Sequence, residues 1–239
     1  MASSANLHNA AQRMRYGSLV SLAAVLFALG AWKLGALVLI WPALSFGLVA
    51  LGYFGLGAWM LGKQRDGTRK AWGYVLAGPF IVFMHALRFA LTKARWREDP
   101  WNEVVDGIYV GRLVPLGELP SDVQTVVDLT SEHLEDPAIR EAKTYVCLPT
   151  LDGSAPGHDE LVDLLRQREE WPGAIYVHCA AGHGRSALVA ACLVVLGGLS
   201  ESIDEAMTLM KQKRPKVHLV PHQRGAAIRA AKTVRAESA

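Results

Sequence analysis

The sequence is poor in cysteine and has no extended basic stripe. It contains three cysteines among 239 residues, Cys147, Cys179 and Cys192. An odd and sparse set does not make a disulfide framework and is typical of a reducing compartment. The formal net charge is only +3, and no run of lysine and arginine is interleaved with aromatic residues. These absences exclude a disulfide-stapled domain and argue against nucleic acid as a partner.

Charge is almost absent from the first third of the chain. Residues 16–62 contain a single charged side chain, Lys33. About 20 helical residues cross the apolar part of a bilayer, so this run is long enough for two crossings. We expect helices over about 17–32 and 36–61, with a turn near Lys33. Pro42 then lies in the first turns of the second helix, where proline is best tolerated. A secretory signal peptide would have a shorter apolar stretch.

A third apolar run covers 71–91 and is interrupted by Gly78–Pro79. It is either a third crossing or a segment that lies within or against the membrane. The aromatic residues Trp72, Tyr74 and Trp96 suit the interfacial zone, where such side chains concentrate.

Basic residues flank each apolar run and predict the orientation. Lysine and arginine near the membrane are enriched on its cytoplasmic side. Such residues stand at both ends of the predicted hairpin and after the third run: Arg13, Arg15, Lys63, Arg65, Arg69, Lys70, Lys93, Arg95 and Arg97. Three full crossings would place the last group outside, whereas a re-entrant or interfacial third segment removes the conflict. We therefore expect an integral membrane protein whose C-terminal domain lies in the cytoplasm.

The sequence pattern changes near Asp99–Pro100, from long apolar runs to short apolar runs between turn residues. We take this change as the boundary between a membrane region, 1–97, and a second domain, 98–239. Short β-branched runs between turn residues predict strands, and apolar residues at helical spacing predict helices. The predicted strands are 108–110, 123–129, 144–148 and 174–177, and the predicted helices are 157–170, 185–198, 200–213 and 221–235. This alternation favours an α/β fold with a central, mainly parallel sheet flanked by helices.

Residues 178–186 read His-Cys-Ala-Ala-Gly-His-Gly-Arg-Ser and join the last predicted strand to a helix. A short loop in this position turns backbone N–H groups inward, and with the helix N-terminus they form an anion cradle. Gly182 and Gly184 allow a positive φ or a close backbone approach. Arg185 can direct its guanidinium fork at two phosphate oxygens. The same donors lower the pKa of the Cys179 thiol, and a thiolate there is suited to attack phosphorus.

Other interpretations of this loop fit less well. A nucleotide-binding P-loop would end in Gly-Lys-Ser/Thr, which is absent. A zinc site would need paired ligands, but His178, Cys179 and His183 stand together without a second cluster. A glycine-rich turn around a buried cysteine does not account for strand, loop and helix in this order. We expect neither a metal nor a cofactor.

The run HCAAGHGRS resembles the signature of the protein-tyrosine and dual-specificity phosphatase superfamily. The similarity covers roughly 101–225 and includes 106–112 (DGIYVGR), 126–130 (VVDLT) and 213–217 (KRPKV). It implies a cysteine-dependent phosphatase that works through a phosphocysteine intermediate without a metal. Together with the apolar N-terminal third, the resemblance suggests a membrane-anchored member of the bacterial type.

The resemblance also implies roles for individual residues. Cys179 takes the position of the nucleophile, and Arg185 takes that of the phosphate-binding arginine. His178 takes the place of the histidine that supports the thiolate, and Ser186 could hydrogen-bond to the sulfur. The backbone that takes the place of the family's phosphate-binding loop, here called the phosphate loop, comprises Ala180, Ala181, Gly182, His183 and Gly184.

A general acid must come from elsewhere in the chain, because the leaving group needs a proton. Residues 148–153 (LPTLDG) match the acid loop of the family, and Asp152 is our candidate. Asp152 and Gly153 could also form only a turn, and Asp159 is the second candidate. The side chain of His183 either tunes substrate choice or points to solvent.

These features predict a phosphomonoester hydrolase acting on a membrane phospholipid or a phosphoprotein. A membrane anchor favours a phosphorylated lipid head group. However, Ala180 and Ala181 stand where several phosphoinositide-cleaving relatives carry a lysine, which weakens a polyphosphoinositide assignment. The alternative is a catalytically silent, membrane-tethered adaptor that binds phosphate. Degenerate relatives of that kind usually lack the Cys, Arg or Asp, and all three are present here.

Overall fold

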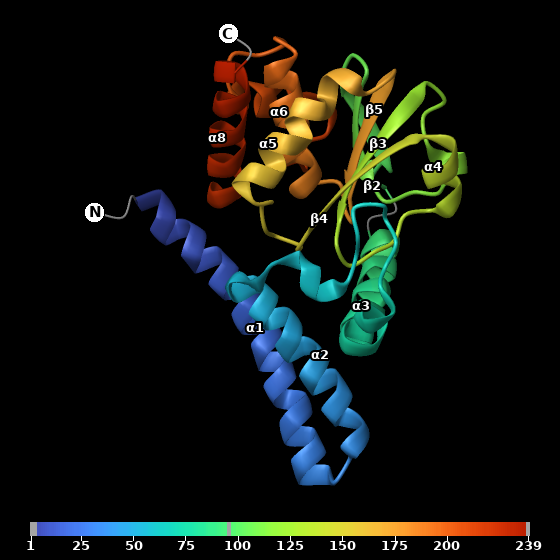
Figure 1. Cartoon of the computed structure of the whole chain (residues 1–239), viewed down its shortest axis with the longest axis vertical. Helices are drawn as coiled ribbons and strands as arrows, with labels where there is room; N and C mark the ends of the chain where they lie inside the picture. Colours follow the sequence, from blue (N-terminus) through green and yellow to red (C-terminus); the bar gives the residue numbers. More distant parts are fainter. Residues whose placement is uncertain (1–3, 95–96, 238–239) are drawn as a thin grey trace.

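The computed structural model describes residues 4–94 and 97–237. Figure 1 shows a helical hairpin that projects from an α/β body. The hairpin consists of α1 (Ser4–Leu34) and α2 (Ile40–Leu51), and α3 (Ala71–Ala94) packs against α2 nearer to the sheet. The predicted turn near Lys33 is confirmed, with Gly35 at φ +63°. Arg95 and Trp96, which were expected to flank the membrane, lie outside the described residues.

Three stretches are long and apolar enough to cross a membrane: Arg15–Leu34, Leu37–Leu56 and Ala71–Ala94. Many of their large apolar side chains are exposed rather than buried within the protein, among them Leu19, Leu22, Trp32, Val38, Leu44, Val82 and Phe89. A soluble protein rarely exposes apolar surface on this scale. The N-terminal helices therefore present the surface expected of segments that contact lipid.

The prediction of one continuous helix over 36–61 was wrong. α2 is preceded by a 3₁₀ turn over 37–39 and continues into a single π turn over 52–56. The helical path then breaks, because Gly55 (φ +141°) and Gly57 (φ +81°) adopt conformations that other residues rarely reach. Pro42 lies in the first turn of α2, as predicted.

Helix α3 runs without a break through Gly78–Pro79, the pair that interrupts the apolar run. Pro79 has no N–H to donate to the carbonyl of Val75, one turn earlier. The indole of Trp41 in α2 donates to that carbonyl instead, with Nε1 2.7 Å from the oxygen. Ser45 Oγ accepts a hydrogen bond from the N–H of Phe80 at 3.2 Å. α2 thus satisfies backbone groups beside the proline, which an apolar environment requires.

The sheet has five strands in the order β1-β2-β5-β3-β4. Strands β2, β5, β3 and β4 are parallel, as predicted, and β1 pairs antiparallel with β2. The strand bounds are β1 (Trp101–Val105), β2 (Ile108–Arg112), β3 (Val123–Thr130), β4 (Thr144–Thr150) and β5 (Ala174–Cys179). β1 was not predicted, because its pairing depends on a tight hairpin at Gly107 (φ +71°) rather than on its own apolar pattern.

Helices cover both faces of the sheet. One face carries α5 (His158–Arg166), α6 (Arg185–Leu196), α7 (Ile203–Lys213) and α8 (Pro221–Glu237), and the other carries the short α4 (Pro137–Ala142). α4 was not predicted, and a 3₁₀ turn over 167–170 follows α5. Helix α6 is buried along almost its whole length beneath the sheet. This placement fixes its N-terminus at the end of the central strand β5.

Contacts join the membrane helices to the α/β body. A short hairpin between α2 and α3, in which Lys63 pairs with Arg69, inserts two basic side chains into the body. Conversely, the side chain of Leu151, a residue of the α/β body, packs in an apolar cluster with α2 residues that include Phe46 and Val49. These contacts reach across the boundary that we place between 97 and 98.

Candidate active site

The loop between β5 and α6 lies at the carboxyl edge of the parallel strands, where open α/β sheets bind their ligands. Cys179 is the last residue of β5, and Arg185 is the first residue of α6. Gly182 has φ +74°, and a Cβ there would collide with the backbone of Gly111. Gly184 has φ −105°, so only Gly182 meets the expected need for a positive φ.

The sulfur of Cys179 lies in the environment of a reactive thiol. The N–H of Gly182 donates to Sγ at 3.3 Å, and Ser186 Oγ lies 3.5 Å from it. Burial alone would raise the pKa of the thiol, but the charge of Arg185 and hydrogen bonds from Ser186 lower it below its usual value. By contrast, burial raises the pKa of Cys147 and of Cys192 to about 12. The surroundings thus lower the pKa of Cys179 and raise that of the two other buried cysteines, and a low pKa is typical of a reactive thiol.

Arg185 is fully buried, and its guanidinium is held in a fixed position. Glu132 binds it through two contacts, at 2.7 and 3.0 Å, and the carbonyl of Thr150 accepts from Nη1 at 2.7 Å. Arg185 Nη2 also lies 3.0 Å from Asp152 Oδ1. Among the described residues, Nε of Arg185 has no hydrogen-bond partner although it is buried. A buried donor without a partner costs free energy, so this nitrogen is suited to a ligand oxygen.

Asp152 lies over Arg185 in the acid loop, and its side chain is half exposed. The loop is attached to the membrane helices: Tyr53 donates to the Asp152 carbonyl at 3.0 Å, and the ring of Tyr16 lies against Gly153. The second candidate, Asp159, is exposed in the first turn of α5. The structure thus brings Asp152 together with Arg185.

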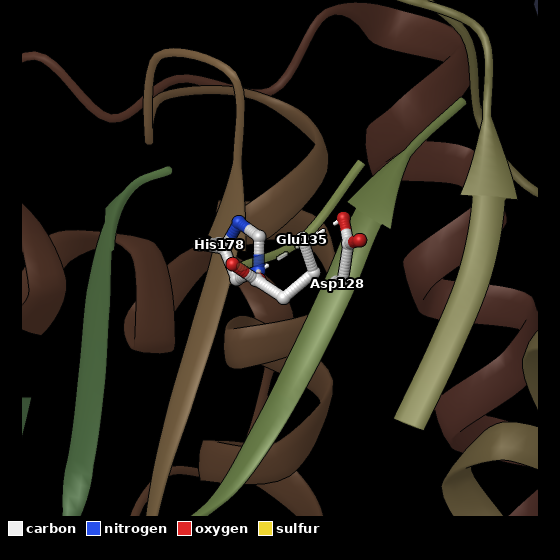
Figure 2. Close-up of side chains that lie close together, drawn as sticks. All are labelled: Asp128, Glu135 and His178. Atoms are coloured by element: carbon white, nitrogen blue, oxygen red, sulfur yellow. Dashed lines mark ion pairs between the residues drawn. The ribbon is translucent and has the colours of Figure 1, made fainter. Parts of the chain in front are cut away.

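His178 faces a buried cluster of carboxylates (Figure 2). Its Nε2 lies 2.7 Å from Glu135 Oε2 and 3.9 Å from Asp128 Oδ1. Burial alone would lower the pKa of the imidazole, but the charges of Glu135 and Asp128 outweigh it and raise that pKa. His178 thus lies between two buried acids, directly before Cys179 in the strand.

Three side chains of this cluster, Asp128, Glu135 and His178, are close enough together to bind a metal ion. Lys63 already brings a positive charge to them: its Nζ lies 2.5 Å from Asp128 Oδ2 and donates to Thr130 Oγ1 at 2.9 Å. A third hydrogen bond, to the carbonyl of His133, measures 2.7 Å. The cluster is therefore built around an ammonium group, and we assign no metal to it.

His183 does not point to solvent. Its Nε2 is hydrogen-bonded to Glu98, which also binds Arg214 at 3.3 Å and Lys216 at 2.7 Å. Arg214 in turn donates to the carbonyl of Gly182 at 2.9 Å. This contact holds a loop carbonyl outward, which leaves the loop N–H groups available to an anion. An effect of His183 on substrate choice stays a prediction.

A cavity of about 80 Å³ opens above the phosphate loop. It is lined by Asp152, Ala180 and Ala181 on the side of the α/β body and by several residues of α3. The α3 side chains that line it are Met84, Leu87, Arg88, Leu91 and Thr92. The apolar helix that was predicted to lie in or against the membrane is therefore part of the candidate site.

The sequence did not reveal the residues that surround the signature. Glu132, Lys63 and Arg214 each pair with a site residue that is distant in the chain. Their only local signals are an acidic residue just after the strand β3, a lysine after an apolar run, and an arginine after a helix. Such signals are too common to identify a site.

The comparisons with known proteins agree with this fold. The family described as "Swiss Army Knife protein, DSP-PTPase phosphatase domain" matches residues 116–239, just over half of the chain. A crystal structure of PTPMT1 in complex with PI(5)P is 19% identical, covers 59% of this chain and 100% of its own, and has a TM-score of 0.50. A structure of Tk-PTP in the active form is 23% identical, covers 56% of this chain and 97% of its own, and also scores 0.50. No curated protein matches the sequence.

Proposed function

The chain belongs to the DSP-PTPase phosphatase family PTP-SAK, and from that premise we propose that it hydrolyses phosphomonoesters through a phosphocysteine intermediate. The observation that carries this proposal is the Cys179 thiol, whose pKa is lowered beside a buried Arg185 that keeps one donor unpaired. A thiolate and an oriented guanidinium are what attack on a phosphate dianion requires.

In the first step the Cys179 thiolate attacks phosphorus, a sulfur–phosphorus bond forms, and the ester oxygen–phosphorus bond breaks. Asp152 donates its proton to the departing alkoxide. In the second step water attacks the phosphocysteine, Asp152 accepts a proton from that water, and inorganic phosphate leaves with regeneration of the thiolate. Ser186, 3.5 Å from the sulfur, stabilises the departing thiolate. The N–H groups of the phosphate loop and Arg185 bind the non-bridging oxygens in both steps.

The contact between Asp152 and Arg185 changes during this cycle. Without substrate, Asp152 Oδ1 lies 3.0 Å from Nη2. A phosphate that binds Nε and Nη2 through two oxygens takes the place of the carboxylate. The released carboxylate takes up a proton from solvent and can then deliver it to the ester oxygen.

We propose a phospholipid monoester as the substrate rather than a phosphoprotein. The supporting observation is the cavity wall: Met84, Leu87 and Leu91 are apolar residues of α3, and they face the phosphate loop. A lipid whose head group enters this cavity can keep its acyl chains against an apolar helix. A phosphorylated loop of a protein would gain nothing from that wall.

The course of α3 supports a proposal for the membrane topology. Arg69, just before the helix, binds the carbonyl of Ser131 at 2.8 Å, and the ring of His85 packs on His133 with the centroids 4.6 Å apart. The helix thus follows the α/β body instead of leaving it. We propose that α1 and α2 cross the membrane, that α3 lies at its surface, and that the catalytic domain, 98–239, is cytoplasmic. Thiol labelling of a cysteine introduced at Glu201 tests the side: labelling of intact cells without permeabilisation would contradict a cytoplasmic domain.

An aryl phosphate assay of the detergent-solubilised full chain tests the reaction. We expect Cys179→Ser to lower the turnover at least about a thousandfold, since nucleophile removal has effects of that order or larger. Cys192→Ser, which removes a buried thiol outside the site, should keep the activity. If the wild type is no faster than Cys179→Ser, the protein is the silent phosphate-binding adaptor instead.

The substrate class is tested with phosphorylated lipids and phosphopeptides presented in the same mixed micelles. We expect a higher kcat/KM for the lipids. A higher value for phosphotyrosine or phosphoserine peptides would assign a phosphoprotein substrate.

A further inference from the structure

The short hairpin between α2 and α3, residues 63–69, is here called the connector. Lys63 and Arg69 pair across it in antiparallel fashion, and cross-strand partners present their side chains on the same side. The turn is held by hydrogen bonds within it, two of which the Asp66 side chain accepts, at 2.7 and 2.8 Å. Lys63 and Arg69 are buried, whereas Arg65 in the turn is exposed. The connector therefore directs two cations, and not the third, into the α/β body.

These two cations bind the backbone on either side of one acidic residue, Glu132. Lys63 Nζ donates to the carbonyl of His133 at 2.7 Å, and Arg69 Nη2 donates to the carbonyl of Ser131 at 2.8 Å. The segment belongs to no helix or strand. Buried backbone carbonyls outside regular structure depend on side chains or ordered water for their hydrogen bonds. The connector supplies such a partner to both carbonyls.

Glu132 in turn holds the guanidinium of Arg185. Its carboxylate accepts two hydrogen bonds from that group, at 2.7 and 3.0 Å, and both side chains are buried. The N–H of Ser131 donates to the same carboxylate at 3.0 Å, so a shift of the backbone at Ser131 also shifts the carboxylate. A misplacement of about 1 Å at a group that orients the reacting centre can cost about a hundredfold in rate.

We propose that Lys63 and Arg69 are positioning residues of the active site, and that they orient Arg185 through the segment that carries Glu132. The membrane region then contributes to the reaction as well as to anchoring. This inference rests on the proposed function, and it deepens that proposal by naming what keeps the phosphate-binding arginine in place.

The experiment measures how strongly the site selects a negative charge, without any turnover. The full chain in detergent micelles is treated with iodoacetate or with iodoacetamide, and alkylation of Cys179 is followed by mass spectrometry. Both reagents react with the thiolate, so the ratio of the two rates does not depend on the pKa of the thiol and reports binding of the carboxylate by Arg185. We expect Arg69→Met and Lys63→Met each to lower this ratio about threefold to tenfold, part of the effect of a charge-assisted hydrogen bond.

The matched control is Arg65→Met, which removes an exposed charge from the same connector and should leave the ratio unchanged. Cys147 and Cys192 report on folding, because both are buried and stay unlabelled in a folded variant. If Arg69→Met exposes them to labelling, Arg69→Lys replaces it. That variant keeps the charge but moves the donor, so its ratio should still lie below the wild-type value.

A double-mutant cycle with Glu132→Gln tests the route. If Arg69 acts through Glu132, Arg69→Met should lower the ratio by less in the Glu132→Gln chain than in the wild type. An equal effect in both would mean that the charge of Arg69 acts directly on the reagent, which overturns the proposal.

An unchanged ratio in either folded variant of Lys63 or Arg69 also overturns the positioning role. If the wild type then still hydrolyses an aryl phosphate, the phosphatase assignment stands. Conversely, a wild type that hydrolyses no aryl phosphate, with a ratio that falls in Arg69→Met, would contradict the proposed function and leave the positioning of Arg185 in place.

Discussion

Two groups of basic residues at the candidate active site use charge in opposite ways. The first, here called the floor, comprises the buried Lys63, His178 and Arg185, and the second, here called the mouth, comprises the cavity-lining Arg88 and Arg112. At the floor, Lys63, His178 and Arg185 are buried, and each has a carboxylate within 2.7 Å. At the mouth, within the part of the chain that the structure describes, Arg88 and Arg112 make no ion pair and contact only backbone carbonyls. Both regions are basic, and they differ in whether the protein itself supplies the counter-ion.

The difference separates two tasks. Paired charges at the floor hold reactive groups in position, and they are costly to disturb because one buried ion remains when its partner is removed. Unpaired charges at the mouth contribute little to the free energy of folding, and their hydrogen-bond donors are available to a ligand. Substitutions at the floor should therefore affect chemistry or stability, and substitutions at the mouth should affect selectivity.

Among the variants that test this comparison, the largest effect is expected at Asp152, which contacts Arg185 and also lines the cavity. Asp152→Asn should lower the turnover of an alkyl phosphate about a hundredfold to ten-thousandfold, the usual contribution of a general acid. With p-nitrophenyl phosphate, whose leaving group needs little protonation, the loss should be smaller. Equal turnover by Asp152→Asn and the wild type, together with a loss in Asp159→Asn, would move the acid role to Asp159.

Stability should depend most on Lys63. Lys63→Met leaves Asp128 charged and buried without its partner, which costs about 3–5 kcal/mol of the free energy of unfolding. Denaturant unfolding of the full chain in detergent micelles measures this loss. Arg65→Met, two residues away and exposed, should change stability by no more than about 0.5 kcal/mol. An equal loss of stability in both variants would mean that the ion pair of Lys63 with Asp128 does not stabilise the protein.

The pH dependence should shift in a direction fixed by the thiol. The reactive form is the thiolate, so activity is lost as the pH falls through the pKa of Cys179. Hydrogen bonds from Ser186 help to hold that pKa low, and their removal raises it. Ser186→Ala should therefore move the acidic limb of the kcat/KM profile to higher pH, with the two profiles converging at alkaline pH. An unmoved limb would show that Arg185 alone sets the thiol pKa.

The smallest effect is expected from Tyr53→Phe. The Tyr53 hydroxyl donates to the Asp152 carbonyl at 3.0 Å, and a neutral hydrogen bond contributes about 0.5–1.5 kcal/mol. The turnover should fall by no more than about tenfold, with stability nearly unchanged. A loss as large as that of Asp152→Asn would mean that the membrane helices, rather than the acid loop itself, fix the position of the acid.

What the sequence predicted well is local. The strand, phosphate loop and helix around Cys179 and Arg185 follow one another directly in the chain, so their pattern is readable without knowledge of the fold. Pro42 and the turn near Lys33 are also local features and were predicted correctly. The parallel sheet followed from the alternation of strands and helices.

What the sequence did not predict depends on partners far away in the chain. Glu132 meets Arg185, and Lys63 meets Asp128, only after the sheet has formed. α3 stays continuous because Trp41 binds the carbonyl freed by Pro79, which no pattern within α3 indicates. The predicted helix 36–61 was too long, because hydropathy alone does not indicate that Gly55 and Gly57 adopt non-helical backbone conformations.

The attachments of the α/β body to the hairpin determine how far the site can reach. A catalytic head on a flexible tether of n residues would sample a distance of about 5–6 Å × √n from its anchor. Here Lys63, Tyr53 and Leu151 fasten the body to α2 and to the segment that follows it. With α1 and α2 inserted as proposed, the height of the phosphate loop above the bilayer is set by rigid helices. The protein then hydrolyses only phosphate esters that lie at one fixed distance from the bilayer. Esters held nearer to the bilayer or farther from it do not reach the phosphate loop, whatever their chemical structure.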